Sequence, residues 1–260
     1  MTEAFYQPLG DDRFQPALHT AGPWNPDAQH FGPPSALLVR ALEGVEGGHG
    51  KQLTRVTVEI LGPAPLTELT VRAGLDRPGR SVELLSAELR DGGRTVARAS
   101  AWRISTSDTA GIATDPMPSL AAPEDAPPAN WPAGWGGGYL ESMEWRAVRG
   151  APDEAGPAAV WARQRVPLVA GEEPSPLQRL FVVADSGNGV SNFLDPRQWW
   201  FINTELTVHL SREPEGEWIG IYARTVVGPR GTGFASSTLH DRSGHVGAGQ
   251  QALLVRSRAG

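Results

Sequence analysis

The chain has 260 residues, a formal net charge of −6 and no cysteine. A mildly acidic chain offers no electrostatic reason to bind nucleic acid or an anionic membrane surface. The missing cysteines exclude disulfides, thiolate zinc sites, iron–sulfur clusters and cysteine nucleophiles. The length suits one large domain or two small ones, and the 31 glycines and 23 prolines favour turns and short strands over a helical bundle.

The start of the chain does not resemble a targeting signal. Residues 1–8 contain an acid and a proline where a signal peptide needs a basic region and an apolar core. No apolar run approaches the roughly 18–20 residues of a membrane span. We therefore expect a cytoplasmic protein with neither nucleic acid nor a membrane as partner.

The first predicted helix covers residues 33–43, where two prolines suit the first turn and Gly44 can end the helix. Four strands follow it. Residues 55–60 alternate polar and apolar side chains, which is typical of a half-buried strand. Gly- and Asp-bearing turns predict antiparallel hairpins between this strand and the next three, at residues 69–73, 82–89 and 95–104.

The second half of the chain repeats this order. Residues 105–135 are rich in Pro, Ala and Ser without a periodic pattern, and we interpret them as a linker. A second helix is predicted from Ser175, a suitable N-cap, to Asp185. Four strands are again expected, at residues 206–210, 218–224, 234–239 and 246–255.

The two strand blocks align with each other without a gap. Residues 53–104 match residues 203–254 at an offset of 150, with identities that include Thr57/Thr207 and Ser86/Ser236. A helix followed by a four-stranded antiparallel meander, used twice, predicts an α+β architecture. We expect an N-terminal unit of residues 1–104 and a C-terminal unit of residues 136–260.

Helix plus meander, repeated, resembles the double hot-dog fold of the TesB-like acyl-CoA thioesterases, in which each sheet wraps round a central helix. The likeness covers nearly the whole chain outside the linker. It is carried by an ordered set of short segments: Gly22-Pro23-Trp24, Gln29-His30-Phe31-Gly32, Ala184-Asp185-Ser186, residues 201–210, Gly216-Glu217-Trp218 and residues 241–251.

The resemblance implies a hydrolytic site without a covalent nucleophile. The family has an aspartate that activates water at the position of Asp185. A carboxylate at a helix C-terminus is disfavoured by the helix dipole, so its presence there needs a reason. If Asp185 activates water as the resemblance implies, burial should raise its pKa and a hydrogen-bond partner should hold it ionised. The resemblance places a water-binding glutamine at Gln250 and a polar donor at Asn203, with Thr204 as the alternative for that donor. Gln251 stays open as the alternative to Gln250, because adjacent strand residues point to opposite faces.

A helix N-terminus with free N–H groups can stabilise the oxyanion of thioester hydrolysis. The resemblance assigns this role to the backbone of Gly32. Where the family often has a second glycine, this chain has Pro33, which lacks an N–H. Trp199 and Trp200 are candidates for lining an acyl channel, with core packing as the simpler interpretation.

The resulting prediction is an acyl-CoA thioesterase that needs no metal and no cofactor, with homodimerisation as a further expectation. One alternative is a non-catalytic acyl-CoA or lipid-binding protein, which the Gly32-Pro33 pair favours. A purely structural partner is a second alternative. His30 superficially resembles the histidine of hot-dog hydratases, but the aspartate that precedes it in that pattern is absent and the spacing differs.

Overall fold

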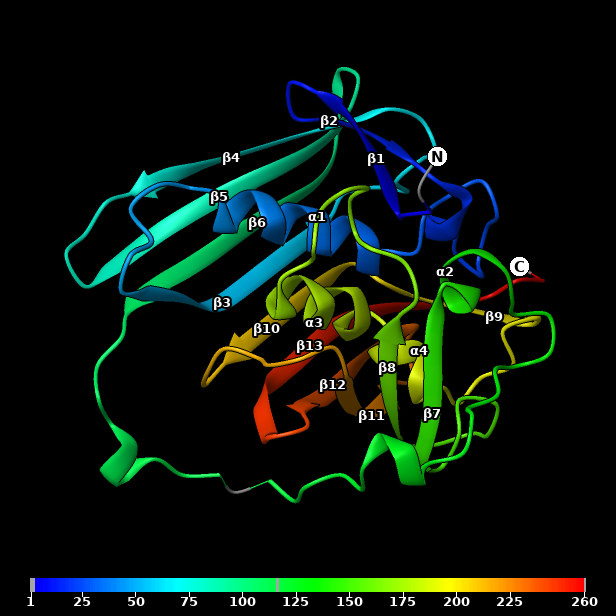
Figure 1. Ribbon diagram of the computed structural model, residues 1–260. Coiled ribbons are helices and arrows are strands. Elements are labelled where there is room, and N and C mark those ends of the chain that lie inside the picture. Colours follow the sequence, from blue (N-terminus) through cyan, green and yellow to red (C-terminus); the bar gives the residue numbers. More distant parts are fainter. Residues whose placement is uncertain (1–2, 116, 260) are drawn as a thin grey trace.

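The computed structural model describes residues 3–115 and 117–259. Its strands form one sheet of thirteen, in the order β1-β2-β4-β5-β6-β3-β10-β13-β12-β11-β8-β7, with β9 paired to β13. Figure 1 shows the two longer helices, α1 and α3, lying next to each other, α1 against strands of the first half and α3 against strands of the second. The sheet and its two helices enclose the hydrophobic core.

Each half contains the predicted helix and four-stranded block. In the first half these elements are α1 (Gly32–Glu43), β3 (Lys51–Ile60), β4 (Leu69–Arg77), β5 (Val82–Asp91) and β6 (Arg94–Ser105). The second half has α3 (Pro176–Ala184), β10 (Glu205–Leu210), β11 (Ile219–Val227), β12 (Thr232–Asp241) and β13 (Gly244–Ser257).

Several elements were not predicted from the sequence, because they are short or lack a clear alternation. The hairpin of β1 and β2 turns at Asp11 and Asp12, which both have positive φ. It lacks the Asn-Gly or Asp-Gly pair by which such turns are usually recognised in a sequence. The other additions are β1 (Tyr6–Gly10), β2 (Arg13–Pro16), α2 (Gly138–Glu141), β7 (Met143–Arg149), β8 (Ala158–Gln164), α4 (Gly187–Val190) and β9 (Trp199–Asn203), with 3-10 turns at Leu18–Thr20, Ala110–Ile112 and Pro123–Asp125.

The two halves meet where β3 pairs antiparallel with β10. Thr57 lies opposite Thr207, and the Thr207 hydroxyl donates to the Thr57 hydroxyl at 3.1 Å. These two residues are equivalent in the repeat, so a local two-fold axis passes between them. Strand pairing inside each half follows the same offset of 150. Ser86 lies opposite Ser100 in the first half, and the residues 150 positions later, Ser236 and Gln250, lie opposite each other in the second half. The gapless alignment of the strand blocks is thereby confirmed.

The segment predicted as a linker begins as an exposed stretch and then packs onto the second half. Residues 106–115 are exposed throughout. Further on, the Ala147 N–H donates to the Pro127 carbonyl and the Ala129 N–H to the Trp145 carbonyl, so this part runs along β7. Trp131 packs edge-on against Trp145 at a centroid distance of 4.9 Å. The second part of the segment therefore contributes to the core.

Helices α1 and α3 run antiparallel and cross closely. A Cβ atom on Gly32, at the start of α1, would lie 2.2 Å from the Val182 carbonyl oxygen near the end of α3. The opposite ends meet where Ser175 and Gln178 of the α3 N-terminus donate to the Glu43 carboxylate. Gly32 is thus needed for the close contact between α1 and α3.

Gly32→Ala tests this contact. Alanine normally stabilises a helix relative to glycine, by up to about 1 kcal/mol. Here the added methyl group meets a backbone oxygen, so we expect the free energy of unfolding to fall by about 1–3 kcal/mol. Urea denaturation measures the change. Gly74→Ala is the matched control, because a Cβ there meets no atom within 4 Å, and an equal loss in both variants would contradict the proposed contact.

Candidate functional site

Asp185 lies at the C-terminal end of α3, where the chain turns into α4. The helix is started by Ser175, whose hydroxyl accepts a hydrogen bond from the Gln178 N–H. The Asp185 residue is only 2% exposed. Burial raises the pKa of its carboxyl group to about 7, against the opposing effect of hydrogen bonds from Asn203, the Phe31 N–H and Gln251. The direction of this shift is the one expected from the sequence.

Two amide side chains hold this carboxyl group. Asn203, the last residue of β9, donates from Nδ2 to Asp185 Oδ1 at 2.7 Å. Gln251 of β13 donates from Nε2 to the Asp185 carbonyl oxygen at 2.9 Å and approaches Oδ1 at 3.5 Å. Its Oε1 accepts from the Asn188 N–H at 3.0 Å. Gln251 thus ties the start of α4 and the end of α3 to the sheet.

The structure corrects the assignment of the glutamine. Gln250 is exposed on the outer face of β13, opposite Thr207, whereas Gln251 is 3% exposed and faces Asp185. Because β13 carries apolar residues on both faces, its alternation alone did not show which glutamine points inward. The repeat indicates which glutamine points inward, because Gln251 aligns with the buried Ala101 whereas Gln250 aligns with Ser100.

The predicted backbone donor at Gly32 is also corrected. The Gly32 N–H donates to His30 Nδ1 at 3.0 Å and is therefore already engaged. His30 Nδ1 lies 3.4 Å from Asp185 Oδ2, and the ring stacks on Tyr139 at a centroid distance of 3.8 Å and an angle of 6°. His30, dismissed from the sequence, is thus part of the site.

A cavity of about 470 Å³ opens beside Asp185. This volume lies in the usual range for small-molecule sites, and the lining is largely apolar with a few polar groups, as such sites commonly are. Both halves of the chain contribute. The lining residues are Gly22, Trp24, Asn25, Ala28, Gln29, His30, Phe31, Ile60, Leu61, Gly62, Pro63, Asp185, Asn188, Trp200, Ile202, Asn203 and Thr204.

The remaining predicted residues divide between the cavity and the surface. Trp200 and Thr204 line the cavity, and the Arg258 guanidinium lies 3.4 Å from the centroid of the Trp200 ring. Thr204 is exposed, and its hydroxyl donates to the Ala252 carbonyl at 3.4 Å. Trp199 is exposed and does not line the cavity. Of the predicted set, Asp185, Asn203, Thr204 and Trp200 come together.

The equivalent corner of the first half lacks this arrangement. There α1 ends at Glu43, whose pKa is raised by burial while Gln178 and Ser175 donate to its carboxylate. The repeat places Leu53 where the second half has Asn203, and Ala101 where it has Gln251. The two amides that hold Asp185 therefore have no polar counterparts in the first half.

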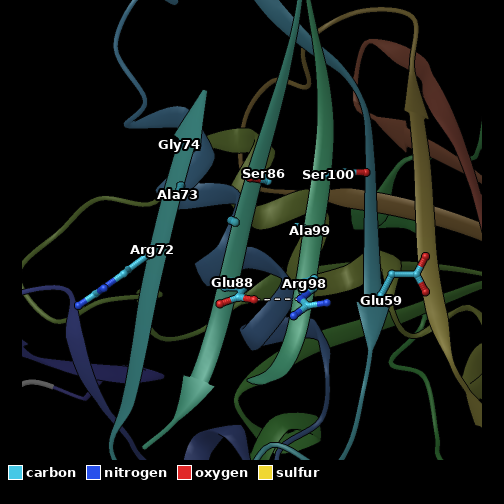
Figure 2. A pocket seen from close by; sticks show the side chains of 10 residues that line it. Glu59, Arg72, Ala73, Gly74, Ser86, Glu88, Arg98, Ala99 and Ser100 are labelled. Carbon is cyan, nitrogen blue, oxygen red and sulfur yellow. Dashed lines mark hydrogen bonds and ion pairs between the residues drawn. The ribbon is translucent and has the colours of Figure 1, made fainter. Parts of the chain in front are cut away.

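A second cavity of similar volume lies on the outer face of the first half. Its lining residues lie on the neighbouring strands β3, β4, β5 and β6, and Figure 2 shows Arg98 reaching Glu88. That contact measures 2.9 Å, and with the Arg90 contact it lowers the pKa of the Glu88 carboxyl group. Small residues such as Gly74 and Ser86 create the hollow, and its charged groups are paired with each other or face solvent. No buried acid or base lines it among the described residues.

The described residues contain no group of three or more His, Cys, Asp or Glu side chains arranged to hold a metal ion. None of the helices in residues 3–115 and 117–259 is long and apolar enough to cross a membrane.

Two models of protein families match most of the chain. The model of the acyl-CoA thioesterase N-terminal domain matches residues 20–104, and that of the C-terminal domain matches residues 123–255. No curated protein gave a match.

Among solved structures, a hot-dog-fold protein from Alicyclobacillus acidocaldarius is similar with a TM-score of 0.75 at 18% identity, covering 97% of this chain and 96% of its own. The acyl-CoA thioesterase II TesB2 from Mycobacterium marinum has a TM-score of 0.67 at 15% identity, with coverages of 98% and 96%. The predicted hot-dog fold is confirmed.

The raised pKa of Asp185 predicts how stability depends on pH. In the folded chain this carboxyl group stays protonated up to about pH 7, whereas in the unfolded chain it ionises above about pH 4. Between these values the unfolded state binds fewer protons, so the contribution of Asp185 to the free energy of unfolding falls by about 1.4 kcal/mol per pH unit as the pH rises.

We expect this decline to vanish in Asp185→Asn. Urea denaturation of both proteins between about pH 4 and pH 8 gives the difference in the free energy of unfolding. A difference that stays constant across this range would show that Asp185 titrates normally.

Proposed function

This chain belongs to the acyl-CoA thioesterase family and is a thioester hydrolase, and we propose that it hydrolyses acyl-CoA to a free acid and CoA in the cavity beside Asp185. The observation that carries the proposal is a buried carboxyl group that lines an apolar cavity and is held by two amides. A group whose pKa lies near the working pH is suited to general base catalysis.

In this mechanism the ionised Asp185 takes a proton from a water molecule in the cavity. The water oxygen forms a bond to the thioester carbon, and the C–S bond then breaks. The acid is released, and the CoA sulfur leaves as a thiolate that takes up the proton. Asn203 lines the cavity and holds Asp185 Oδ1, so it fixes the orientation of the carboxylate.

Gln251 acts as a positioning residue in this proposal. It does not line the cavity, and it approaches the carboxyl group from the side of the sheet. Its hydrogen bond lowers the pKa of Asp185 against the effect of burial. The glutamine thereby keeps part of the carboxyl population ionised near neutral pH.

We further propose that the chain is a double hot-dog, with repeats at residues 1–104 and 136–260 and a connection at 105–135. The shared strand register at an offset of 150 and the two-fold axis between Thr57 and Thr207 support this division. The cavity draws lining residues from both repeats. Neither repeat alone would then form the complete site.

Acyl-CoA binding without turnover is the second candidate function. One observation favours it: the Gly32 N–H is engaged by His30, and Pro33 has no N–H, so the usual backbone donors for an oxyanion are missing. Release of free thiol from short-, medium- and long-chain acyl-CoAs separates the two functions. Saturable binding with no thiol release from any of them would establish the binding protein.

The adjacent glutamines provide a matched pair of variants for the hydrolytic mechanism. Gln251→Ala removes the hydrogen bond to Asp185 Oδ1 that favours the ionised carboxylate, so we expect kcat to fall about 10–100-fold at neutral pH. In the wild type, ionisation of Asp185 should give the pH–rate profile a rising limb near pH 7. In Gln251→Ala this limb should move to higher pH. Gln250→Ala should keep both the rate and the profile of the wild type.

These values are measured by thiol release across about pH 5–9. Equal losses in the two glutamine variants, or a profile that does not move in Gln251→Ala, would remove Gln251 from the mechanism.

A further inference from the structure

Thioester hydrolysis generates negative charge on the carbonyl oxygen, and this oxygen needs a hydrogen-bond donor. The backbone N–H groups at the start of α1, where the resemblance placed this donor, do not provide it. Pro33 has no N–H, the Gly32 N–H donates to His30, and the Phe31 N–H is directed at the Asp185 carboxyl group. A different donor must therefore face the substrate.

His30 is held firmly in the wall of the cavity. Its side chain is 13% exposed and lines the cavity beside Asp185. One face of the ring stacks on the buried Tyr139, whose hydroxyl donates to the Val182 carbonyl at 2.8 Å and bonds the Ser186 hydroxyl. The plane of the imidazole is thus fixed by a residue that is itself anchored to α3.

The hydrogen bond from Gly32 also defines which ring nitrogen carries the proton. Because the Gly32 N–H donates to Nδ1, this nitrogen presents its lone pair and the proton resides on Nε2. In the part of the chain that the structure describes, the titratable groups that contact the ring are the Asp185 carboxyl group at the end of α3 and Tyr139 of α2, whose ring stacks on it. Burial lowers the pKa of His30 to about 3, so the ring is neutral at physiological pH.

The Nε2–H group lies on the edge of the ring away from Gly32. Within residues 3–115 and 117–259, no protein group accepts a hydrogen bond from it. A polar N–H in the wall of an apolar cavity, without a protein acceptor, is suited to an acceptor on the ligand.

We propose that the Nε2–H of neutral His30 donates a hydrogen bond to the thioester carbonyl oxygen and stabilises the oxyanion that forms there. This role rests on the proposed acyl-CoA hydrolysis. The proton stays on Nε2 throughout, while Asp185 handles the proton of the attacking water. A neutral imidazole can serve as such a donor when its Nδ1 is fixed as an acceptor.

The competing role would make His30 the general base, oriented by Asp185. It requires a proton on Nδ1 that points to Asp185 Oδ2, 3.4 Å away. A proton on Nδ1 would clash with the hydrogen of the Gly32 N–H, which is directed at the same nitrogen. The geometry therefore favours the donor, and the two roles respond differently to substitution.

The variants His30→Gln and His30→Ala distinguish the hydrogen-bond donor role from the general-base role. Glutamine supplies a neutral N–H donor but cannot act as a base, so we expect it to keep at least about a tenth of the wild-type kcat. Alanine should lower kcat about 10²–10³-fold with little change in KM. His49→Ala, in an exposed loop outside the cavity, is the control for removing a histidine, and circular dichroism checks that each variant is folded.

A glutamine variant as inactive as the folded alanine variant would overturn the donor role. A second readout does not depend on turnover. Nitrogen NMR of the wild type should show the His30 proton on Nε2, and a ketone analogue of acyl-CoA should shift that N–H resonance, whereas a thioether analogue without the carbonyl should not.

The two proposals can fail separately. If the wild type releases no thiol from any acyl-CoA, the hydrolytic function is wrong, while the ketone-dependent shift still supports the His30 contact with a bound carbonyl. If thiol is released but the proton lies on Nδ1, or the ketone leaves the resonance unchanged, the hydrolase stands and the inference about His30 is overturned.

Discussion

The site depends on a carboxyl group that two antiparallel helices hold away from water. Asp185 stands at the C-terminus of α3, where the helix dipole disfavours a negative charge, and next to the N-terminus of α1, where the dipole favours one. The close approach at Gly32 brings these two ends together. Burial dominates, so the carboxyl group titrates near neutrality, and the hydrogen bonds from Asn203 and Gln251 prevent a larger shift.

The duplicated architecture explains why such a group can exist in a chain of this size. The paired strands β3 and β10 join both halves into one sheet, and each buried helix packs against strands of its own half and against the other helix. Only one of the two equivalent corners carries both amides, because Leu53 and Ala101 stand at the corresponding positions of the first half. That half instead contributes the loop with His30 and the backbone at the start of α1. The halves have therefore diverged into complementary parts of one cavity.

Much of this could be predicted from the sequence, and the remainder depended on tertiary packing. The period-2 strands and the repeat predicted both blocks and their alignment at an offset of 150, and the resemblance pointed to Asp185 and Asn203. The choice between Gln250 and Gln251 was not decided locally, because Leu253 points inward and Leu254 outward on the same strand. The engagement of the Gly32 N–H could not be foreseen either, since it depends on where the His30 ring stacks.

The most direct test is a titration of the Asp185 carboxyl group itself, followed by carbon NMR in the intact chain with Asp185→Asn for assignment. A buried carboxyl group held between the helix ends should change its chemical shift with a midpoint at about pH 7. A midpoint near 4, the value of an ordinary exposed aspartate, would show that the carboxyl group is hydrated and would contradict its role as a general base poised near neutral pH.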